Sequence, residues 1–331
     1  MINIAIVGAT GLVGQTFLKV LEEKKLDKYT YTLFASNRSK DKLIHFMNQD
    51  YIVKELNEDS FKNTFFDYAL FSAGGNISKK FIPIANESGT IVIDNSSFFR
   101  MNDDVPLVIP EVNEKDIYTN NKIISNPNCS TIQAVMPIKA LNDTNKIKRI
   151  IYSTYQAVSG AGNSGILDLR NTRNGEKANK FPYDISKNCI PQIDTFLENG
   201  YTKEEIKMIE ETKKILKEPK LPITATCVRV PVENSHSESI NIEFENEFNI
   251  EDVIKTLSNF KNILVVDDIQ NLKYPINELA NDTDKVLVGR IRRDFSVKNG
   301  INIWVVADNI RKGSATNAIQ ILEKLIEKQT N

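Results

Sequence analysis

The sequence predicts an α/β protein of two domains: a doubly wound parallel sheet near the N-terminus, followed by an α+β domain with a mixed sheet. Its 331 residues are about twice the length of a typical domain of ~150 residues. In the first half, short apolar runs alternate with amphipathic stretches, which is typical of parallel strands joined by helices. From about Arg149 the apolar runs become longer and alternate with polar residues, which favours a mixed or antiparallel sheet.

The first domain begins with an apolar strand at residues 4–7, which ends at Gly8. Residues 15–24 then carry apolar side chains at helical spacing, which predicts an amphipathic helix. Further buried strands are predicted at residues 31–35, 68–72, 90–94 and 122–125. Because ligands of parallel sheets bind at the carboxyl ends of the strands, the loops after these strands are the first places to look for a site.

The second domain is predicted to contain strands at residues 149–157, 223–232, 238–244 and 301–307. Helices are expected at residues 191–198 and 203–217, and Thr202 with Glu205 forms a capping-box pattern before the second of them. The last amphipathic stretch, residues 314–328, is a helix that could return to the first domain. The predicted domains are therefore 1–127 with 308–331, and 128–307.

Composition excludes several classes of protein. The 42 Lys and Arg residues against 43 Asp and Glu residues give a net charge of -1, so we expect a small-molecule ligand and neither nucleic acid nor a membrane as partner. No apolar run reaches the ~20 residues of a membrane span, and a strand begins at once without a signal-peptide core, so a cytoplasmic location is expected. Three cysteines and two histidines are too few for a disulfide framework or a dense metal cluster, so no metal site is expected.

A glycine-rich loop follows the first strand. IAIVGATGLVG, residues 4–14, spaces Gly8, Gly11 and Gly14 as GxxGxxG between a strand and a helix. Glycines let the backbone turn sharply and approach a pyrophosphate, which the helix N-terminus stabilises. This pattern predicts a Rossmann-like, dinucleotide-binding domain; the alternative is a tight turn that serves helix packing only. The residues expected to contact the cofactor here are Gly8, Thr10, Gly11, Leu12 and Val13.

The loop after the second strand bears on the choice of cofactor. NAD-binding sites usually carry an acidic residue there, but this chain has none before Asp41. Ser36, Arg38 and Ser39 could instead bind and neutralise a ribose phosphate. The loop therefore favours NADP(H) over NAD; the alternative is a solvated loop with an incidental arginine.

The position of one cysteine predicts a nucleophile. Cys129 follows a strand and a proline turn, at the expected start of a helix that runs to about Ala140. The helix dipole and the unpaired N–H groups at such a position stabilise a thiolate, which is the nucleophilic form. Cys189 and Cys227 fit inert packing better, and His45, in a charged stretch expected to be helical, is assigned to the surface.

Several motifs together resemble the aspartate-semialdehyde dehydrogenases. They span nearly the whole chain: GATGLVG (8–14), DNSSFFRM (94–101), VIPEVN (108–113), NPNCST (126–131), YQAVSGAG (155–162), PQID (191–194), ETKKI (211–215), CVRVPV with SHSES (227–239) and GRIRRD (289–294). N-acetyl-glutamyl-phosphate reductases share the glycine loop and a cysteine, but they would be expected to have glycine before the cysteine and tyrosine after it. This chain has Asn128 and Ser130.

The resemblance implies that Cys129 is the acyl-thioester nucleophile, that His236 is the acid/base and that Gln156 orients the acyl group. The residues support these roles independently, because the cysteine and the histidine both lie at strand ends, where a cleft can bring them together. An unperturbed histidine pKa near ~6.5 would let His236 exchange a proton at cellular pH. The alternative is a hydrogen-bonded structural histidine.

The resemblance also assigns the charged side chains. Arg100 and Lys214 correspond to a phosphate-binding pair, Arg229 to a clamp on the substrate carboxylate, and Glu211 to a contact with the substrate amino group. Charge-assisted bonds suit such anions, and a buried arginine in an apolar strand needs an anionic partner. For Glu211 and Lys214 the alternative is a surface ion pair.

Three more residues resemble the part of the family's site that contacts the nicotinamide amide: Ser159, Gly160 and Asn309. The resemblance further implies a homodimer, with a tetramer left open. The segment between Gly162 and Cys189 is short and polar here, and family members use this region for contacts between subunits, which leaves the details of assembly open.

The implied activity is the NADPH-dependent reductive dephosphorylation of 4-aspartyl phosphate to aspartate 4-semialdehyde, with phosphate as product and, in reverse, as co-substrate. It implies a place in lysine, threonine, methionine and diaminopimelate biosynthesis. One alternative is another acyl-phosphate reductase with a longer substrate. The other is a catalytically silent NADP-binding regulator, against which the presence of Cys129, Gln156, Arg229 and His236 together argues.

Overall fold

A computed structural model describes residues 2–119 and 122–330 of the chain. The chain divides into two compact units, and the described residues of the first fall within Met1–Pro127 and Ser314–Asn331, those of the second within Asn128–Gly313. The chain re-enters the first unit at Ser314, whereas the sequence suggested a return at residue 308.

The first unit contains a parallel sheet in the order β5-β2-β1-β6-β7-β8. Its strands are β1 (Asn3–Val7), β2 (Thr30–Ala35), β5 (Lys54–Glu55), β6 (Tyr68–Phe71), β7 (Ile91–Asp94) and β8 (Ile123–Ser125). Counted along the chain, this is the order 3-2-1-4-5-6 of the Rossmann fold. The predicted fold class is confirmed, and the glycine loop follows β1, beside the point where the order reverses between β1 and β6.

Helices cover both faces of this sheet, as they do in doubly wound folds. They are α1 (Leu12–Glu23), α2 (Gly75–Glu87) and α9 (Thr316–Thr330). Alternate residues of β1 point to opposite faces: Ile4 and Ile6 lie in one core cluster with α1 and α9, whereas Ala5 and Val7 lie in another with α2. The amphipathic C-terminal helix therefore belongs to the first unit.

A small hairpin, β3 (Leu43–Phe46) with β4 (Gln49–Ile52), replaces the helical stretch that was expected around His45. That prediction was wrong because Met47 and Asn48 both adopt positive φ, 53° and 58°, which makes the tight turn of a hairpin. His45 is exposed and pairs with Asp50 at 2.9 Å, so its surface position is confirmed. The remaining short elements of the unit are η1 (Asn37–Ser39), α3 (Pro110–Asn113) and η2 (Glu114–Tyr118).

The second unit contains a mixed sheet in the order β10-β9-β11-β14-β13-β12. Its strands are β9 (Ile147–Gln156), β10 (Ile223–Arg229), β11 (His236–Phe244), β12 (Ile263–Val265), β13 (Val286–Asp294) and β14 (Gly300–Ala307). The two edge pairs, β10 with β9 and β12 with β13, are parallel, and the central pairs are antiparallel. The mixed sheet is as predicted, although β12 and β13 were not foreseen.

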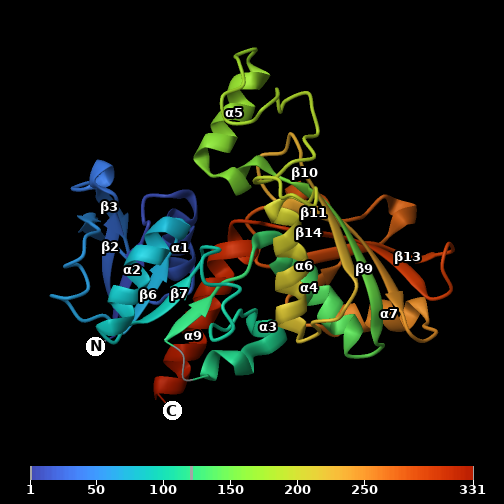
Figure 1. Cartoon of the computed structure of the whole chain (residues 1–331), viewed down its shortest axis with the longest axis horizontal. Coiled ribbons are helices and arrows are strands. Elements are labelled where there is room, and N and C mark those ends of the chain that lie inside the picture. Colours follow the sequence, from blue (N-terminus) through green and yellow to red (C-terminus); the bar gives the residue numbers. More distant parts are fainter. Residues whose placement is uncertain (1, 120–121, 331) are drawn as a thin grey trace. The chain divides into compact units, whose positions relative to one another are not determined.

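Three helices pack on this sheet (Figure 1): α4 (Cys129–Asn142), α6 (Lys203–Leu216) and α7 (Ile250–Asn259). The predicted capping box begins α6, since Thr202 Oγ1 accepts from Glu205 N at 3.3 Å and Glu205 Oε2 accepts from Thr202 N at 2.7 Å. Smaller helical turns are η3 (Val158–Ala161), η4 (Ile269–Asn271), α8 (Asn277–Ala280) and η5 (Arg311–Ala315). None of the described helices is long and apolar enough to cross a membrane.

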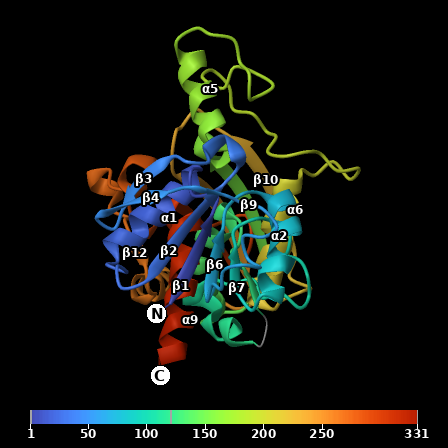
Figure 2. The same cartoon turned by 90° about the vertical axis from the view of Figure 1, so that its left-hand side faces the viewer.

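The segment between β9 and α6 departs most from the prediction. α5 (Asn163–Arg173) was not foreseen and projects away from the sheet of its unit (Figures 1 and 2). Residues 191–198, predicted to be helical, form no helix: Asp194 adopts a left-handed φ of 69°, Phe196 bridges to Thr202, and the preceding Ile190 bridges to Arg229. The positive φ of Asp194 overrides the weak helical pattern here. Cys189 is exposed, so the expectation of a packed cysteine at this position was also wrong.

Candidate active site

The predicted nucleophile is the first residue of α4. Asn128 caps this helix, because its Oδ1 accepts from Ser130 N at 2.9 Å and from Thr131 N at 3.3 Å. Cys129 is half-buried, and its thiol therefore lies at the positive end of the helix dipole. This is the environment in which a thiolate is favoured.

His236, the first residue of β11, is buried and faces this cysteine. Its Nε2 lies 3.3 Å from Cys129 Sγ. Its Nδ1 accepts a hydrogen bond from Ala157 N at 3.0 Å. Because a backbone N–H can only donate, the neutral ring must carry its proton on Nε2. The ring therefore presents a donor to the sulfur, which suits a thiolate.

Burial, reinforced by the neighbouring Arg229, lowers the pKa of His236 to about 3, although Glu204 acts in the opposite direction. The expectation that His236 titrates near neutral pH is therefore wrong for this arrangement. The imidazole is therefore neutral at cellular pH, with its proton on Nε2.

Arg229 ends β10 and is 5% exposed. Its Nη1 donates to Ala157 O at 2.6 Å, and no carboxylate of the described residues lies within ion-pair distance of the guanidinium. Burial lowers the pKa of Arg229, while Glu204 and Cys129 oppose that shift. A β-carbon on Gly160 would lie 2.9 Å from Arg229 Nη1 and 3.3 Å from the His236 ring, so glycine allows this loop to approach both side chains.

Gln156 is the last residue of β9 and is buried. It lies opposite Arg229 in the register of β9 with β10, and β11 flanks β9 on the other side. Its Nε2 donates to Glu204 Oε1 at 3.1 Å, while its Oε1 accepts from Thr154 Oγ1 at 3.2 Å. The structure thus brings four predicted residues to one end of the second unit's sheet: Cys129, Gln156, Arg229 and His236.

Glu211, on α6, is 1% exposed, and its Oε2 accepts from Asn128 N at 2.7 Å. Lys214 lies three residues further along the same helix and is half-buried. Because Glu211 is buried, the alternative of a surface ion pair does not hold for this residue. Arg100 belongs to the first unit, where it is buried and its Nη2 donates to Asn95 O at 2.9 Å.

The glycine loop has the geometry that a dinucleotide needs. Gly8 has φ 88°, and a β-carbon there would lie 2.3 Å from Ser72 O; one on Gly14 would lie 2.1 Å from Gly8 O. Helix α1 begins directly after Gly11, so its N-terminus faces the loop. Thr10 Oγ1 donates to Ser39 Oγ at 3.2 Å, which joins the loop to the predicted ribose-phosphate segment after β2.

Two of the residues assigned to the nicotinamide amide lie together in the second unit. Asn309 Nδ2 donates to Ser159 Oγ at 3.0 Å, and Asn309 Oδ1 accepts from Ser235 N at 2.9 Å. Both side chains are buried. Ser159 and Asn309, 150 positions apart in the chain, therefore form one buried polar cluster next to Gly160.

The fold and the cysteine–histidine pair define a semialdehyde dehydrogenase. Residues 3–120 match the family model described as "Semialdehyde dehydrogenase, NAD binding domain", and residues 138–312 match "Semialdehyde dehydrogenase, dimerisation domain". The chain belongs to the aspartate-semialdehyde dehydrogenase family. It is 50% identical to the aspartate-semialdehyde dehydrogenase of Aquifex aeolicus, over 98% of both chains.

Solved structures agree with this assignment. Aspartate semialdehyde dehydrogenase II of Vibrio cholerae, solved in complex with ASA, is 46% identical and superposes with a TM-score of 0.93 over 99% of this chain and 98% of that one. The enzyme of Candida albicans, solved with NADP, is 27% identical, with a TM-score of 0.79 over 99% of both chains.

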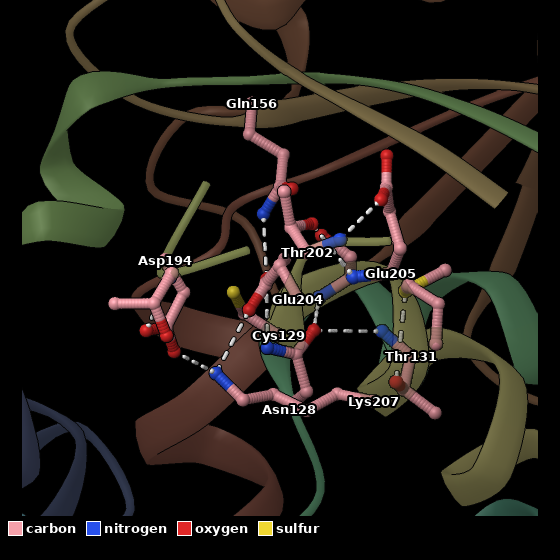
Figure 3. A network of polar contacts seen from close by, with 12 residues as sticks. Asn128, Cys129, Thr131, Gln156, Asp194, Thr202, Glu204, Glu205 and Lys207 are labelled. Atoms are coloured by element: carbon pink, nitrogen blue, oxygen red, sulfur yellow. Dashed lines mark hydrogen bonds and ion pairs between the residues drawn. The ribbon is translucent and has the colours of Figure 1, made fainter. Parts of the chain in front are cut away.

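Sequence reasoning missed the polar residues behind the site, Asn128, Glu204 and Lys207 (Figure 3). Asn128 could have been found as the N-cap of the helix that begins at the cysteine. Glu204 could not, because an acidic residue in the first turn of a helix is ordinarily solvated. Cys227 is buried, and burial raises its pKa well above the usual thiol range, as expected for an inert cysteine.

Proposed function

We propose that this protein catalyses the NADPH-dependent reductive dephosphorylation of 4-aspartyl phosphate to aspartate 4-semialdehyde, and the reverse reaction with phosphate, with Cys129 as the nucleophile. The observation that carries the proposal is the 3.3 Å contact between Cys129 Sγ and His236 Nε2 at the start of α4, in a chain of this family. The family's place in amino-acid biosynthesis supports the same role, on the route to lysine, threonine, methionine and diaminopimelate.

The Cys129 thiolate attacks the acyl carbon of the substrate, and the bond from that carbon to the phosphate oxygen breaks with its electron pair, leaving a thioester on Sγ. NADPH, when bound, supplies a hydride to the thioester carbon. His236 Nε2 donates its proton to the carbonyl oxygen as this carbon becomes tetrahedral. When the C–S bond breaks, the aldehyde leaves, Sγ is again a thiolate, and the hydroxyl proton returns to Nε2.

Different polar and charged residues bind the different groups of the substrate. Arg229, buried and without a carboxylate partner among the described residues, binds the α-carboxylate in a charge-assisted contact. Glu211 receives the substrate amino group, and Gln156 holds the acyl oxygen through the N–H that Glu204 does not use. Arg100 and Lys214 bind the phosphate.

The cofactor is NADP(H). The glycine loop fits a pyrophosphate because β-carbons at Gly8 and Gly14 would collide with the backbone. Ser36, Arg38 and Ser39 receive the ribose phosphate, and a relative solved with NADP supports this choice. Ser159, Gly160 and Asn309 would hold the nicotinamide amide.

The protein works as a homodimer in the cytoplasm, assembled through its second unit. The match of residues 138–312 to a dimerisation domain supports this assembly. Its partners are small molecules. The near-zero net charge agrees with ligands that a few positively charged side chains bind locally.

The test is an absorbance assay of NADP reduction by aspartate semialdehyde, with and without phosphate, on the wild type, Cys129→Ser and Cys189→Ser. We expect phosphate-dependent activity in the wild type and a loss on the order of 10³-fold or more in Cys129→Ser. Cys189→Ser, which alters an exposed cysteine, should keep the wild-type rate. Equal rates in wild type and Cys129→Ser would refute the nucleophile, and rates independent of phosphate would refute the acyl-phosphate substrate.

A further inference from the structure

A buried acid connects several loops at one end of the second unit's sheet. Asp308 follows β14 directly and is 2% exposed. Its Oδ1 accepts from the backbone N–H groups of Ile310 and Arg311, both at 2.9 Å. Its Oδ2 accepts from Asp282 N at 2.9 Å and from Asn234 Nδ2 at 2.8 Å. One carboxylate therefore joins the turn after β14, the turn before β13 and the loop that leads into β11.

A row of hydrogen bonds runs from this carboxylate, through Asn234, to the backbone of Ser235. Asn234 Oδ1 accepts from Ser159 Oγ at 3.1 Å, and Ser159 Oγ in turn accepts from Asn309 Nδ2 at 3.0 Å. Asn309 Oδ1 ends the row by accepting from Ser235 N at 2.9 Å. Asn234 is half-buried and the other members are buried. The row includes two of the residues assigned to the nicotinamide amide, Ser159 and Asn309.

The two ends of the row fix the direction of every bond in it. Ser235 N–H can only donate, so the oxygen of the Asn309 amide faces it and the nitrogen faces Ser159. The carboxylate of Asp308 can only accept, so the nitrogen of the Asn234 amide faces it and the oxygen faces Ser159. The single hydroxyl proton of Ser159 therefore points to Asn234, although Asn309 Oδ1 lies only 3.2 Å away.

This direction determines what the row offers to a ligand. Asn309 Nδ2 uses one N–H on Ser159, so its second N–H can donate to the carbonyl oxygen of a nicotinamide carboxamide. Ser159 Oγ uses its proton and one lone pair, which leaves the other lone pair to accept from the carboxamide NH₂. If the Asn234 amide were reversed, its nitrogen would donate to Ser159 and occupy that lone pair. The carboxylate of Asp308 thus selects the arrangement that complements a carboxamide.

We propose that Asp308 is a positioning residue of the cofactor site: through Asn234 it sets the direction of the Ser159 hydroxyl, and with it the match of Ser159 and Asn309 to the carboxamide. The proposal rests on the proposed function for the identity of the ligand, but not for the direction of the hydrogen bonds. Asp308 acts through Asn234 and Ser159 and not on the cofactor itself.

The test measures, by calorimetry, the binding of NADP and of its 3-acetylpyridine analogue, in which a methyl group replaces the carboxamide NH₂. Asp308→Asn places an N–H against Asn234 and allows its amide to reverse. Asn234→Ala removes the acceptor of the hydroxyl and leaves the three backbone bonds of Asp308 intact. In both variants we expect the preference for NADP over the analogue to fall ~5-fold, which corresponds to one hydrogen bond.

The matched control is Asp267→Asn. The carboxylate of Asp267 also accepts from backbone N–H groups, those of Arg290 at 2.9 Å and Ile291 at 2.8 Å, but it takes no part in the row. We expect this variant to keep the wild-type preference. A merely structural effect would weaken the binding of both dinucleotides equally and leave the preference unchanged.

A signal of the ligand-free protein separates this role from the proposed function. The side-chain NH₂ signals of Asn234, assigned by their loss in Asn234→Ala, should shift in Asp308→Asn and stay unchanged in Asp267→Asn. An unchanged preference in Asn234→Ala, an equal fall in Asp267→Asn, or unshifted Asn234 signals in Asp308→Asn would each overturn the proposal. If the wild type bound neither dinucleotide, the proposed function would fall, and the Asn234 signals would still decide whether Asp308 sets this amide.

Discussion

The backbone N–H of Ala157 determines which form of His236 faces the sulfur. Because this N–H donates to Nδ1 at 3.0 Å, protonation of Nδ1 would place two donors against each other. His236 therefore faces Cys129 as a neutral imidazole that presents its Nε2 proton to the sulfur, unlike the imidazolium of other cysteine enzymes. A neutral donor can deliver its proton to the acyl oxygen without a preceding protonation from solvent.

This tautomer can be observed directly, since the chain has only two histidines. In His45→Gln, the ring nitrogens of His236 are the only histidine ring signals in a ¹⁵N spectrum. We expect Nε2 to be protonated and Nδ1 unprotonated, with no change in either signal between pH 8 and 5, because the pKa is lowered to about 3. Titration of the ring near pH 6.5, or a proton on Nδ1, would contradict the assignment.

For single residues, the sequence indicated which side chains to expect in the site, but not how their surroundings shift their pKa values. The sequence predicted Cys129, Gln156, Arg229 and His236 as site residues, and the structure places all four at strand or helix ends at one end of the second unit's sheet. The lowered pKa of His236 could not be foreseen, because it depends on burial and on Arg229, which is adjacent in the sheet but not in the chain.

Among the elements, α6 carries Glu204 and Glu211, which bond to Asn128 beside the cysteine, and the predicted phosphate-binding residue Lys214. Its first turn is fixed by the capping box of Thr202 and Glu205. Any fraying of this turn would release Glu204 from Asn128 and Gln156. The stability of one helix end is therefore connected to the geometry of the nucleophile.

Thr202→Ala tests this connection. The side-chain acceptor for Glu205 N is lost, so we expect the free energy of unfolding to fall by ~1 kcal/mol. We also expect a lower kcat at temperatures where the protein is still fully folded, because Glu204 becomes less well placed. Chemical denaturation and the NADP assay measure the two effects. Asn249→Ala removes the cap of α7 and is the control, with loss of stability alone. An unchanged kcat in Thr202→Ala would contradict the connection.

The elements also show where sequence patterns fail. Elements with a clear apolar pattern, including β1, α6 and α9, were found to within a few residues, and α4 was found from the turn that precedes it. The errors fall in the hairpin around His45 and in residues 191–198, where turn residues with positive φ override weak helical patterns. α5 was missed because it projects from the sheet of its unit and carries a short apolar pattern.

At the scale of the whole molecule, the second unit contains a buried acid that no partner satisfies. Glu238 follows His236 by two residues on β11, is 0% exposed, and has no hydrogen-bond partner for either carboxyl oxygen among the described residues. Burial, with a smaller contribution from Glu204, raises the pKa of Glu238 well above its usual value of 4.5. The folded protein therefore keeps a proton that the unfolded chain has released.

This difference makes stability depend on pH. For a carboxyl whose folded pKa is raised, the stabilising contribution is complete below about pH 4.5 and is lost as pH rises towards the folded value. Glu238→Gln removes the effect, so its free energy of unfolding should increase relative to wild type by up to ~1.4 kcal/mol per pH unit above pH 5. Denaturant unfolding at pH 5 to 8 measures this, with exposed Glu247→Gln as the control. Parallel curves for wild type and Glu238→Gln would contradict it.

The central claim, an acyl group carried on Cys129, can be tested by trapping that group. Wild-type protein is mixed with aspartate semialdehyde and NADP in the absence of phosphate, quenched in acid, digested and analysed by mass spectrometry. We predict that the peptide containing Cys129 gains the mass of one aspartyl group, and that phosphate added before the quench removes it. An aspartyl group on another residue, or none at all in protein that turns over with phosphate, would contradict the account.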